Sequence, residues 1–154
     1  MANHKYTQES AGSGRVSTDD YVDEVMGRLY NGYCLDDKRG LAPDGFRIPN
    51  ANDWKTLNSF LGIEVAARRM LPAEILQMYH PDTEASGFSA YLGGCRTNHG
   101  LFEYDGERGF WWVLDDSLNQ DYASVRSIHL HIGDIDEAVV HKAYGFSIRC
   151  LRDT

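Results

Sequence analysis

His129 and His131 stand two positions apart near the C-terminus, so both would project from one face of a β-strand. Imidazole nitrogens at this spacing are typical metal ligands, and Asp134, Asp136 or His141 could complete such a site. A polar strand face that binds no metal has the same pattern. We therefore expect no metal and no other cofactor, and we treat the histidines as candidate ligand contacts.

A short acidic segment, DDSLNQD, precedes the histidines and contains Asp115, Asp116 and Asp121. Carboxylates are the ligands that Ca²⁺ prefers, so this segment could hold a hard cation. A solvated acidic loop is the simpler interpretation. Tyr122 and Arg126 follow the segment, and such side chains combine stacking area with hydrogen-bonding edges.

Exposed side chains of these kinds on the terminal strands could form a ligand-binding face. The candidate residues are Asp115, Asp116, Asp121, Tyr122, Arg126, His129, His131, Asp134 and Asp136. The alternative, that they are ordinary residues on the surface of a sheet, stays open.

No combination of residues typical of catalysis occurs in the sequence. It has no nucleophile beside a base, no glycine-rich phosphate loop and no conventional zinc motif. Cys34, Cys95 and Cys150 are odd in number, lie in apolar surroundings and form no CxxC pair. One disulfide with a spare thiol is one arrangement, but we expect three buried free thiols. We expect the protein not to be an enzyme.

The composition indicates one globular domain. The chain has 154 residues, of which 42% are hydrophobic and 25% charged. Its net charge of -8 argues against nucleic acid as a partner, because phosphate binding needs clustered Lys and Arg. No apolar run is long enough to span a membrane, and the N-terminus lacks the apolar core of a signal peptide. We expect no direct membrane insertion, and a location in the cytoplasm or on a particle released by lysis.

The N-terminal part divides into a tail and a helix. Residues 1–16 are polar and rich in Ser and Gly, which predicts a flexible tail. Residues 17–154 would form the domain, beginning with a short amphipathic helix whose apolar residues recur at helical spacing as far as Leu29. The segment RLYNGYCL at 28–35 is dense in aromatic and aliphatic residues, which predicts a strand.

Further helices are expected in the first half of the domain. Asn50 is a candidate N-cap, with Asp53 in the capping-box position, and Gly62 would end this helix. Two shorter helical segments follow at 64–70 and 73–79, on either side of Pro72.

Residues 86–112 are expected to form the folding nucleus. Phe88 to Leu92 alternate in polarity as a strand does, and Gly93–Gly94 would end or bulge that strand. Trp111 and Trp112 would point to opposite faces of another strand, so at least one of them should be buried. Later strands are predicted at 122–132, around 139–140 and at 144–151.

Four segments of the sequence resemble a known family in order and spacing. They are GRLYNGYCLDDKRGLAPDGFRIPNANDWKTLNSFLG (27–62), GFSAYLGGCR (87–96), GERGFWWV (106–113) and YGFSIRCLRD (144–153). They are similar to the Fibrobacter succinogenes major paralogous domain, and the resemblance covers nearly everything after residue 26. It implies an α+β chain with a C-type-lectin-like fold, in which two helices pack beside a small twisted antiparallel sheet.

The resemblance also implies a class of function. Members of this family occur mostly as surface modules of Bacteroidetes-type bacteria and in their phages, and they are taken to bind rather than to catalyse. We therefore expect a non-enzymatic recognition or adhesion module on a phage particle, which binds a host or cell-surface glycan or protein through its C-terminal strands and loops. The alternative is a structural subunit of a virion that docks on other virion proteins through its N-terminal tail and helix.

Overall fold

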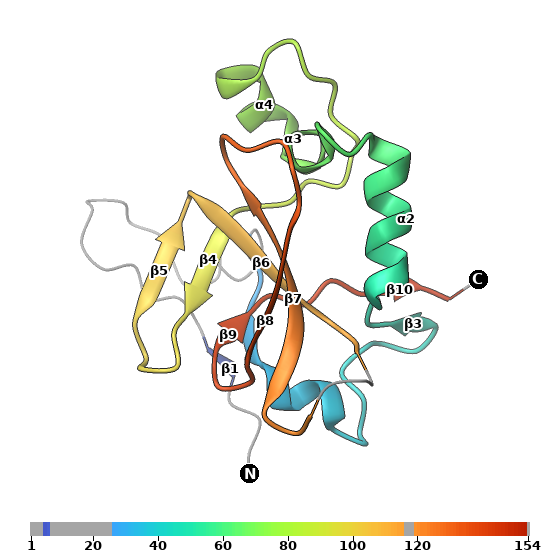
Figure 1. Cartoon of the computed structure of the whole chain (residues 1–154), viewed down its shortest axis with the longest axis vertical. Helices are drawn as coiled ribbons and strands as arrows, with labels where there is room; N and C mark the ends of the chain where they lie inside the picture. The colour runs from blue at the N-terminus through green and yellow to red at the C-terminus, as the bar shows by residue number, and fades with distance from the viewer. Residues whose placement is uncertain (1–4, 7–25, 116–118, 154) are drawn as a thin grey trace.

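The computed structural model describes residues 5–6, 26–115 and 119–153. In these parts of the chain, α-helices, one 3₁₀ helix and β-strands combine into an α+β fold. The 3₁₀ helix is η1 (Gly32–Asp36), and the α-helices are α2 (Ala51–Leu61), α3 (Ala66–Met70) and α4 (Ala73–Tyr79). Helices α3 and α4 lie at one end of the sheet, α2 along its side and η1 at the other end (Figure 1). Within the described residues, no helix has both the length and the apolar character that crossing a membrane requires.

Most strands belong to one mixed sheet. Its members are β1 (Lys5–Tyr6), β2 (Leu29–Asn31), β4 (Gly93–Arg96), β5 (Phe102–Asp105), β6 (Arg108–Val113), β7 (Tyr122–His129), β8 (Asp136–His141) and β9 (Gly145–Phe146). Their order is β1-β2-β9-β4-β6-β7-β8, with β5 paired to β4. The pairs are antiparallel except for β4 and β6. A separate antiparallel pair joins β3 (Phe46–Arg47) to β10 (Leu151–Arg152), next to the start of α2 (Figure 1).

Helix α2 begins and ends where the sequence predicts. The Asn50 side chain accepts hydrogen bonds from the backbone N–H groups of Asn52 and Asp53, and the Asp53 carboxylate accepts one from the Asn50 N–H. This reciprocal capping box satisfies donors that a helix start otherwise leaves unpaired. Gly62 takes a positive φ of 89° directly after the helix, which is a conformation that side chains disfavour.

Strand β6 separates two groups of buried apolar residues. Trp111 packs in one group, with Trp54 and Ile128, between the helices and the sheet. Trp112 packs in the other group, with Phe146, on the opposite face. Both tryptophans are buried, at 5% and 0% exposure, so the pair fixes the packing on both faces of the sheet.

The predicted strand from Phe88 to Leu92 does not form. Ser89 has a positive φ of 50°, which is incompatible with a strand, and the ladder begins at Gly93 instead. Ala90 and Leu92 are nevertheless buried while Ser89 is exposed. The alternation in polarity therefore indicates which of these residues are buried, although the segment does not pair as a strand.

The predicted strand at 28–35 is also shorter than expected. Only Leu29–Asn31 are extended, and the chain then tightens into η1. Gly32 donates its N–H to the carbonyl of Lys142 at 2.7 Å, and an added Cβ at Gly32 would meet Lys142 atoms at 2.7–3.0 Å. This close approach, which needs glycine, directs the chain away from the sheet.

The N-terminal predictions lie mostly outside the described residues. Lys5 and Tyr6, from the predicted tail, form β1 and pair with β2. Of the predicted N-terminal helix, only the last residues are described: Met26 lies in a turn and Leu29 in β2. The α+β class is confirmed, whereas two helices beside a small antiparallel sheet is an imprecise description of three α-helices, a larger mixed sheet and a two-stranded pair among the described residues.

Candidate functional site

The structure divides the predicted ligand-binding residues between the two ends of β7. Tyr122 begins this strand and His129 ends it, so their backbones lie about 23 Å apart at the usual rise per residue. Arg126, between them, is only 6% exposed, which disagrees with the prediction of a ligand contact. Its guanidinium pairs with Glu137 at 3.2 Å across β7 and β8 and donates to the Val125 carbonyl.

At the first end, Asp115 and Tyr122 line a small hollow of about 160 Å³. Lys142, buried there, forms an ion pair with Asp36, and Asp115 accepts a hydrogen bond from the Ser124 hydroxyl at 2.9 Å. Asp121 is exposed and its carbonyl accepts the Lys142 N–H. The charged groups of Lys142, Asp36 and Asp115 therefore already have partners within the fold. Asp116 lies outside the described residues.

At the other end, His129 and His131 are neighbours whose ring centroids lie 5.9 Å apart. The His129 Nδ1 accepts the backbone N–H of His131 at 3.1 Å, which leaves Nε2 as the free ring nitrogen. Asp136 pairs with Arg108 at 2.8 Å, and Asp134 is exposed. The part of the chain that the structure describes contains no group of three or more His, Cys, Asp or Glu side chains placed to hold a metal.

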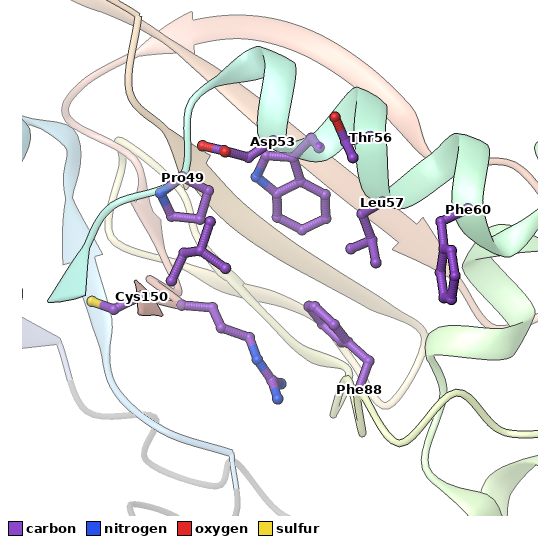
Figure 2. A pocket seen from close by; sticks show the side chains of 10 residues that line it. Pro49, Asp53, Thr56, Leu57, Phe60, Phe88 and Cys150 are labelled. Atoms are coloured by element: carbon purple, nitrogen blue, oxygen red, sulfur yellow. The ribbon is translucent and has the colours of Figure 1, made fainter. Parts of the chain in front are cut away.

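A larger hollow lies elsewhere, beside helix α2. We call it the α2 groove; it encloses about 540 Å³ and is shown in Figure 2. Its lining residues come from three separate segments of the chain: Pro49, Asp53, Trp54, Thr56, Leu57, Phe60, Phe88, Arg149, Cys150 and Leu151. Helical periodicity places Trp54 and Leu57 on the inner side of α2, where they form one wall.

Aromatic side chains dominate the α2 groove. Phe60 lies near the C-terminal end of α2 and is 81% exposed, which is unusual for a large apolar side chain. Phe88 reaches into the space from the opposite side, as Figure 2 shows, and its ring lies 6.2 Å from that of Trp54. Contact between an apolar surface of this kind and water is unfavourable, so a ligand that covers the surface lowers the free energy of the system.

Arg149 contributes the positive charge of the α2 groove. Its guanidinium carbon lies 4.0 Å from the centroid of the Phe88 ring, and Nη1 donates weakly to the Ser89 carbonyl at 3.5 Å. Partial burial lowers the pKa of Arg149, although an arginine stays charged near neutral pH. Within the described residues no carboxylate pairs with this guanidinium, so it is available to an anionic group.

Asp53 and Thr56, two other polar residues of the α2 groove, already have hydrogen-bond partners. Both oxygens of Asp53 accept from the Arg47 guanidinium at 2.6 and 2.8 Å, and this pairing lowers the pKa of Asp53. The Thr56 hydroxyl donates to the Asn52 carbonyl at 2.9 Å. The groove thus offers apolar contact and one cation, and little further hydrogen-bonding capacity.

Comparison with known proteins gives one match. A family model described as the Fibrobacter succinogenes major domain matches residues 2–152. The chain belongs to this family. No curated protein and no solved structure matches the chain. The resemblance found in the sequence is therefore confirmed at the level of the family.

In this Fibrobacter succinogenes major domain, the cysteines are unpaired thiols. Cys34 and Cys95 are buried, and burial raises their pKa values to about 12 and about 11. Cys150 is half-buried, lines the α2 groove and also has a raised pKa because of burial. Thiolate is the reactive form of cysteine, so all three environments disfavour nucleophilic chemistry.

Sequence reasoning missed the α2 groove because its walls are distant in the chain. Trp54, Leu57 and Phe88 are residues that one expects in a core, and the pattern does not say that they also border a hollow. One signal was present: Phe60 falls outside the apolar stripe of Trp54, Leu57 and Leu61 on the predicted helix. A large aromatic residue on the outer part of a helix is an indication of a binding surface.

Proposed function

We propose that this domain is a non-catalytic recognition module that binds a protein ligand in the α2 groove. The ligand would insert an apolar side chain between Phe60 and Phe88 and would place a neighbouring carboxylate on Arg149. The observation that carries this proposal is an exposed, aromatic groove in which, among the described lining residues, the charge without a carboxylate partner is a guanidinium.

The size of the α2 groove supports a binding role. A hollow of about 540 Å³ falls within the range that is usual for ligand sites. The groove is also built on rigid elements, because Trp54 is anchored in the core against Trp111 at 6.1 Å. A preformed site loses little free energy to ordering when a ligand arrives.

The chemistry of the α2 groove favours protein over glycan. A saccharide carries many hydroxyl groups, and each one that is buried without a partner costs free energy. Asp53 and Thr56 already have partners, so Arg149 is the principal polar group available. An apolar side chain next to an acidic residue or a C-terminal carboxylate matches these contacts better.

Non-catalytic recognition is the class of function that the sequence predicts, but the proposed binding surface is the α2 groove and not the C-terminal strands. The C-terminal strands were expected to bind, but their candidate residues lie at two ends of β7 and several are engaged in internal contacts. A C-type-lectin-like arrangement is part of the proposal, supported by helices beside a twisted, mostly antiparallel sheet. A place on a phage particle stays a prediction, as does a role for the N-terminal segment in a virion.

A titration with small probes tests the proposal. Two-dimensional NMR of the ¹⁵N-labelled chain would be recorded with 4-phenylbutyrate and with 4-phenylbutan-1-ol, which has the same apolar part without the charge. We expect both probes to shift signals of groove residues and the acid to bind more tightly. Arg149→Gln should weaken binding of the acid by about tenfold, because a charge-assisted hydrogen bond is lost, and should leave the alcohol unaffected.

Phe60→Ser should weaken both probes, and Ile63→Ser is the matched control. Ile63 is also an exposed apolar residue, at 61%, but does not line the groove. Equal affinity for acid and alcohol, or equal effects of the two substitutions, would overturn the proposal. Glycan-array binding that Phe60→Ser retains and a Tyr122→Ala/His129→Ala/His131→Ala variant loses would return the function to the terminal strands.

A further inference from the structure

Strand β8 is an edge of the main sheet, and no strand in the described parts of the chain pairs with its outer side. The strand pairs with β7 on one side only, and it is the last strand in the order of the sheet. Residues 136–139 are all exposed, with Val139 at 54%. The strand contains neither proline nor lysine, residues with which proteins often protect an edge.

The register shows which backbone groups of β8 point outward. Lys142 donates its N–H to the carbonyl of Asp121. Antiparallel pairing alternates, so Asp136, Ala138 and Val140 bond to β7, while residues 137, 139 and 141 face away from it. Among the described residues, no hydrogen bond occupies the outward N–H and C=O groups of Glu137 and Val139, so they can pair with a further strand. The His141 carbonyl, in contrast, also accepts the N–H of Tyr144 at 3.1 Å.

The sequence of β8 is complementary to a second copy of itself that runs antiparallel. It reads DEAVVH, with acidic residues at the start, an apolar centre and a histidine at the end. In an antiparallel pair of two copies centred on Val139, each Glu137 lies opposite His141 of the other copy, and the two Val139 side chains meet at the centre. Parallel pairing would instead bring like charges together, which is unfavourable.

We propose that two copies of this domain associate through β8, as a two-fold antiparallel pair centred on Val139. The hydrogen-bonding pattern agrees with this register, because residues 137, 139 and 141 are the outward-facing ones and they pair with one another in it. A two-fold interface uses the same surface on both copies, as most homodimers do. The inference is independent of the groove and goes beyond the proposed recognition of a ligand.

The His141 ring is held in a form suited to this contact. Its Nδ1 accepts the N–H of Ala143 at 3.0 Å, so the neutral ring carries its proton on Nε2. The ring packs edge-on against Tyr122 at 5.4 Å and Tyr33 at 6.5 Å. Nε2 can therefore donate to the Glu137 carboxylate of the second copy without needing a charge. The dimer would also carry two α2 grooves, which increases the strength of binding to a repetitive surface.

Cysteine cross-linking tests the register directly. In a Cys150→Ala background, Val139→Cys places the two new thiols opposite each other, with Cα atoms about 5.5 Å apart, which is within disulfide range. Asp136→Cys is the control, because the same strand would hold its thiols about 20 Å apart. The surface ion pair that this control loses, with Arg108, contributes little stability. We expect rapid dimer formation under mild oxidation for the first variant only.

Light scattering after size-exclusion chromatography, from micromolar to millimolar concentration, gives the second readout. The full chain should show a concentration-dependent dimer. Val139→Pro should be monomeric but folded, because the N–H that it removes points away from β7. A monomer at every concentration, a dimer that persists in a folded Val139→Pro variant, or equal cross-linking of the two cysteine variants would each overturn the proposal. If Val139→Pro does not fold, the cysteine pair decides.

Discussion

Two buried tryptophans differ in one hydrogen bond, and this difference predicts different stabilities. The indole N–H of Trp112 donates to the Tyr30 carbonyl at 2.7 Å and so joins β6 to β2. The indole N–H of Trp54 is equally hidden from solvent, but it has no acceptor among the described residues. The exposed fractions of the two side chains are 0% and 4%. A change of either residue to phenylalanine removes the same atoms from a packed interior.

The shared loss of packing should cost about 1–2 kcal/mol at each site, a fraction of the cost of deleting the whole side chain. Trp112→Phe also removes a donor from the Tyr30 carbonyl, which adds about 1–2 kcal/mol. Trp54→Phe removes a donor that had no partner, so it relieves a desolvation cost and destabilises the fold less. We therefore expect Trp112→Phe to lower the free energy of unfolding by about 1–3 kcal/mol more than Trp54→Phe.

Urea unfolding followed by far-UV circular dichroism measures the difference. Linear extrapolation gives each free energy of unfolding, and an unchanged slope would show that both variants unfold between the same states. Circular dichroism is preferred over tryptophan fluorescence because each substitution removes a fluorophore. Equal destabilisation by the two substitutions, or a larger effect of Trp54→Phe, would refute the reasoning.

The remaining predictions concern glycines and thiols. Gly133→Ala should destabilise the fold by about 2 kcal/mol or more, because its new Cβ would collide with the Glu64 carbonyl. Gly106→Ala should destabilise it by about 1 kcal/mol, because Gly106 has a positive φ but open space around it. Thermal unfolding of the two variants measures the difference. Cys150 should react with a thiol reagent well before Cys34. Burial raises the pKa of the Cys34 thiol in the folded chain to about 12, so the thiol loses its proton at a lower pH in the unfolded chain than in the folded one. The free energy of unfolding should therefore fall as the pH rises above about 9.

Local rules in the sequence predicted those elements that depend on neighbouring residues. The capping box of Asn50 and Asp53 fixes the start of α2, and its partners are two and three residues away. Pro72 separates α3 from α4 for an equally local reason. Family resemblance supplied the α+β class, which periodicity alone does not determine.

Other features depend on distant contacts, and the sequence did not predict them. Phe88 to Leu92 alternate like a strand, but the backbone hydrogen bond from Ala90 to Met70 fixes this segment against α3 instead. Arg126 is polar and was expected on the surface, whereas an ion pair with Glu137 allows its burial. The α2 groove depends on Arg149 lying against Phe88, 61 positions earlier in the chain. No local sequence pattern predicts a contact between residues so far apart in the chain.

The position of β9 has a consequence for how the chain reaches its fold. This strand, Gly145–Phe146, lies between β2 and β4, so it connects the N-terminal strands to the rest of the sheet. During synthesis on the ribosome, β2 therefore has no place in the central sheet until residue 146 has emerged. Contacts between such distant segments slow folding, because a long loop must close before they form. We expect the emerging chain to remain incompletely folded for most of its synthesis and to complete its sheet in one late step.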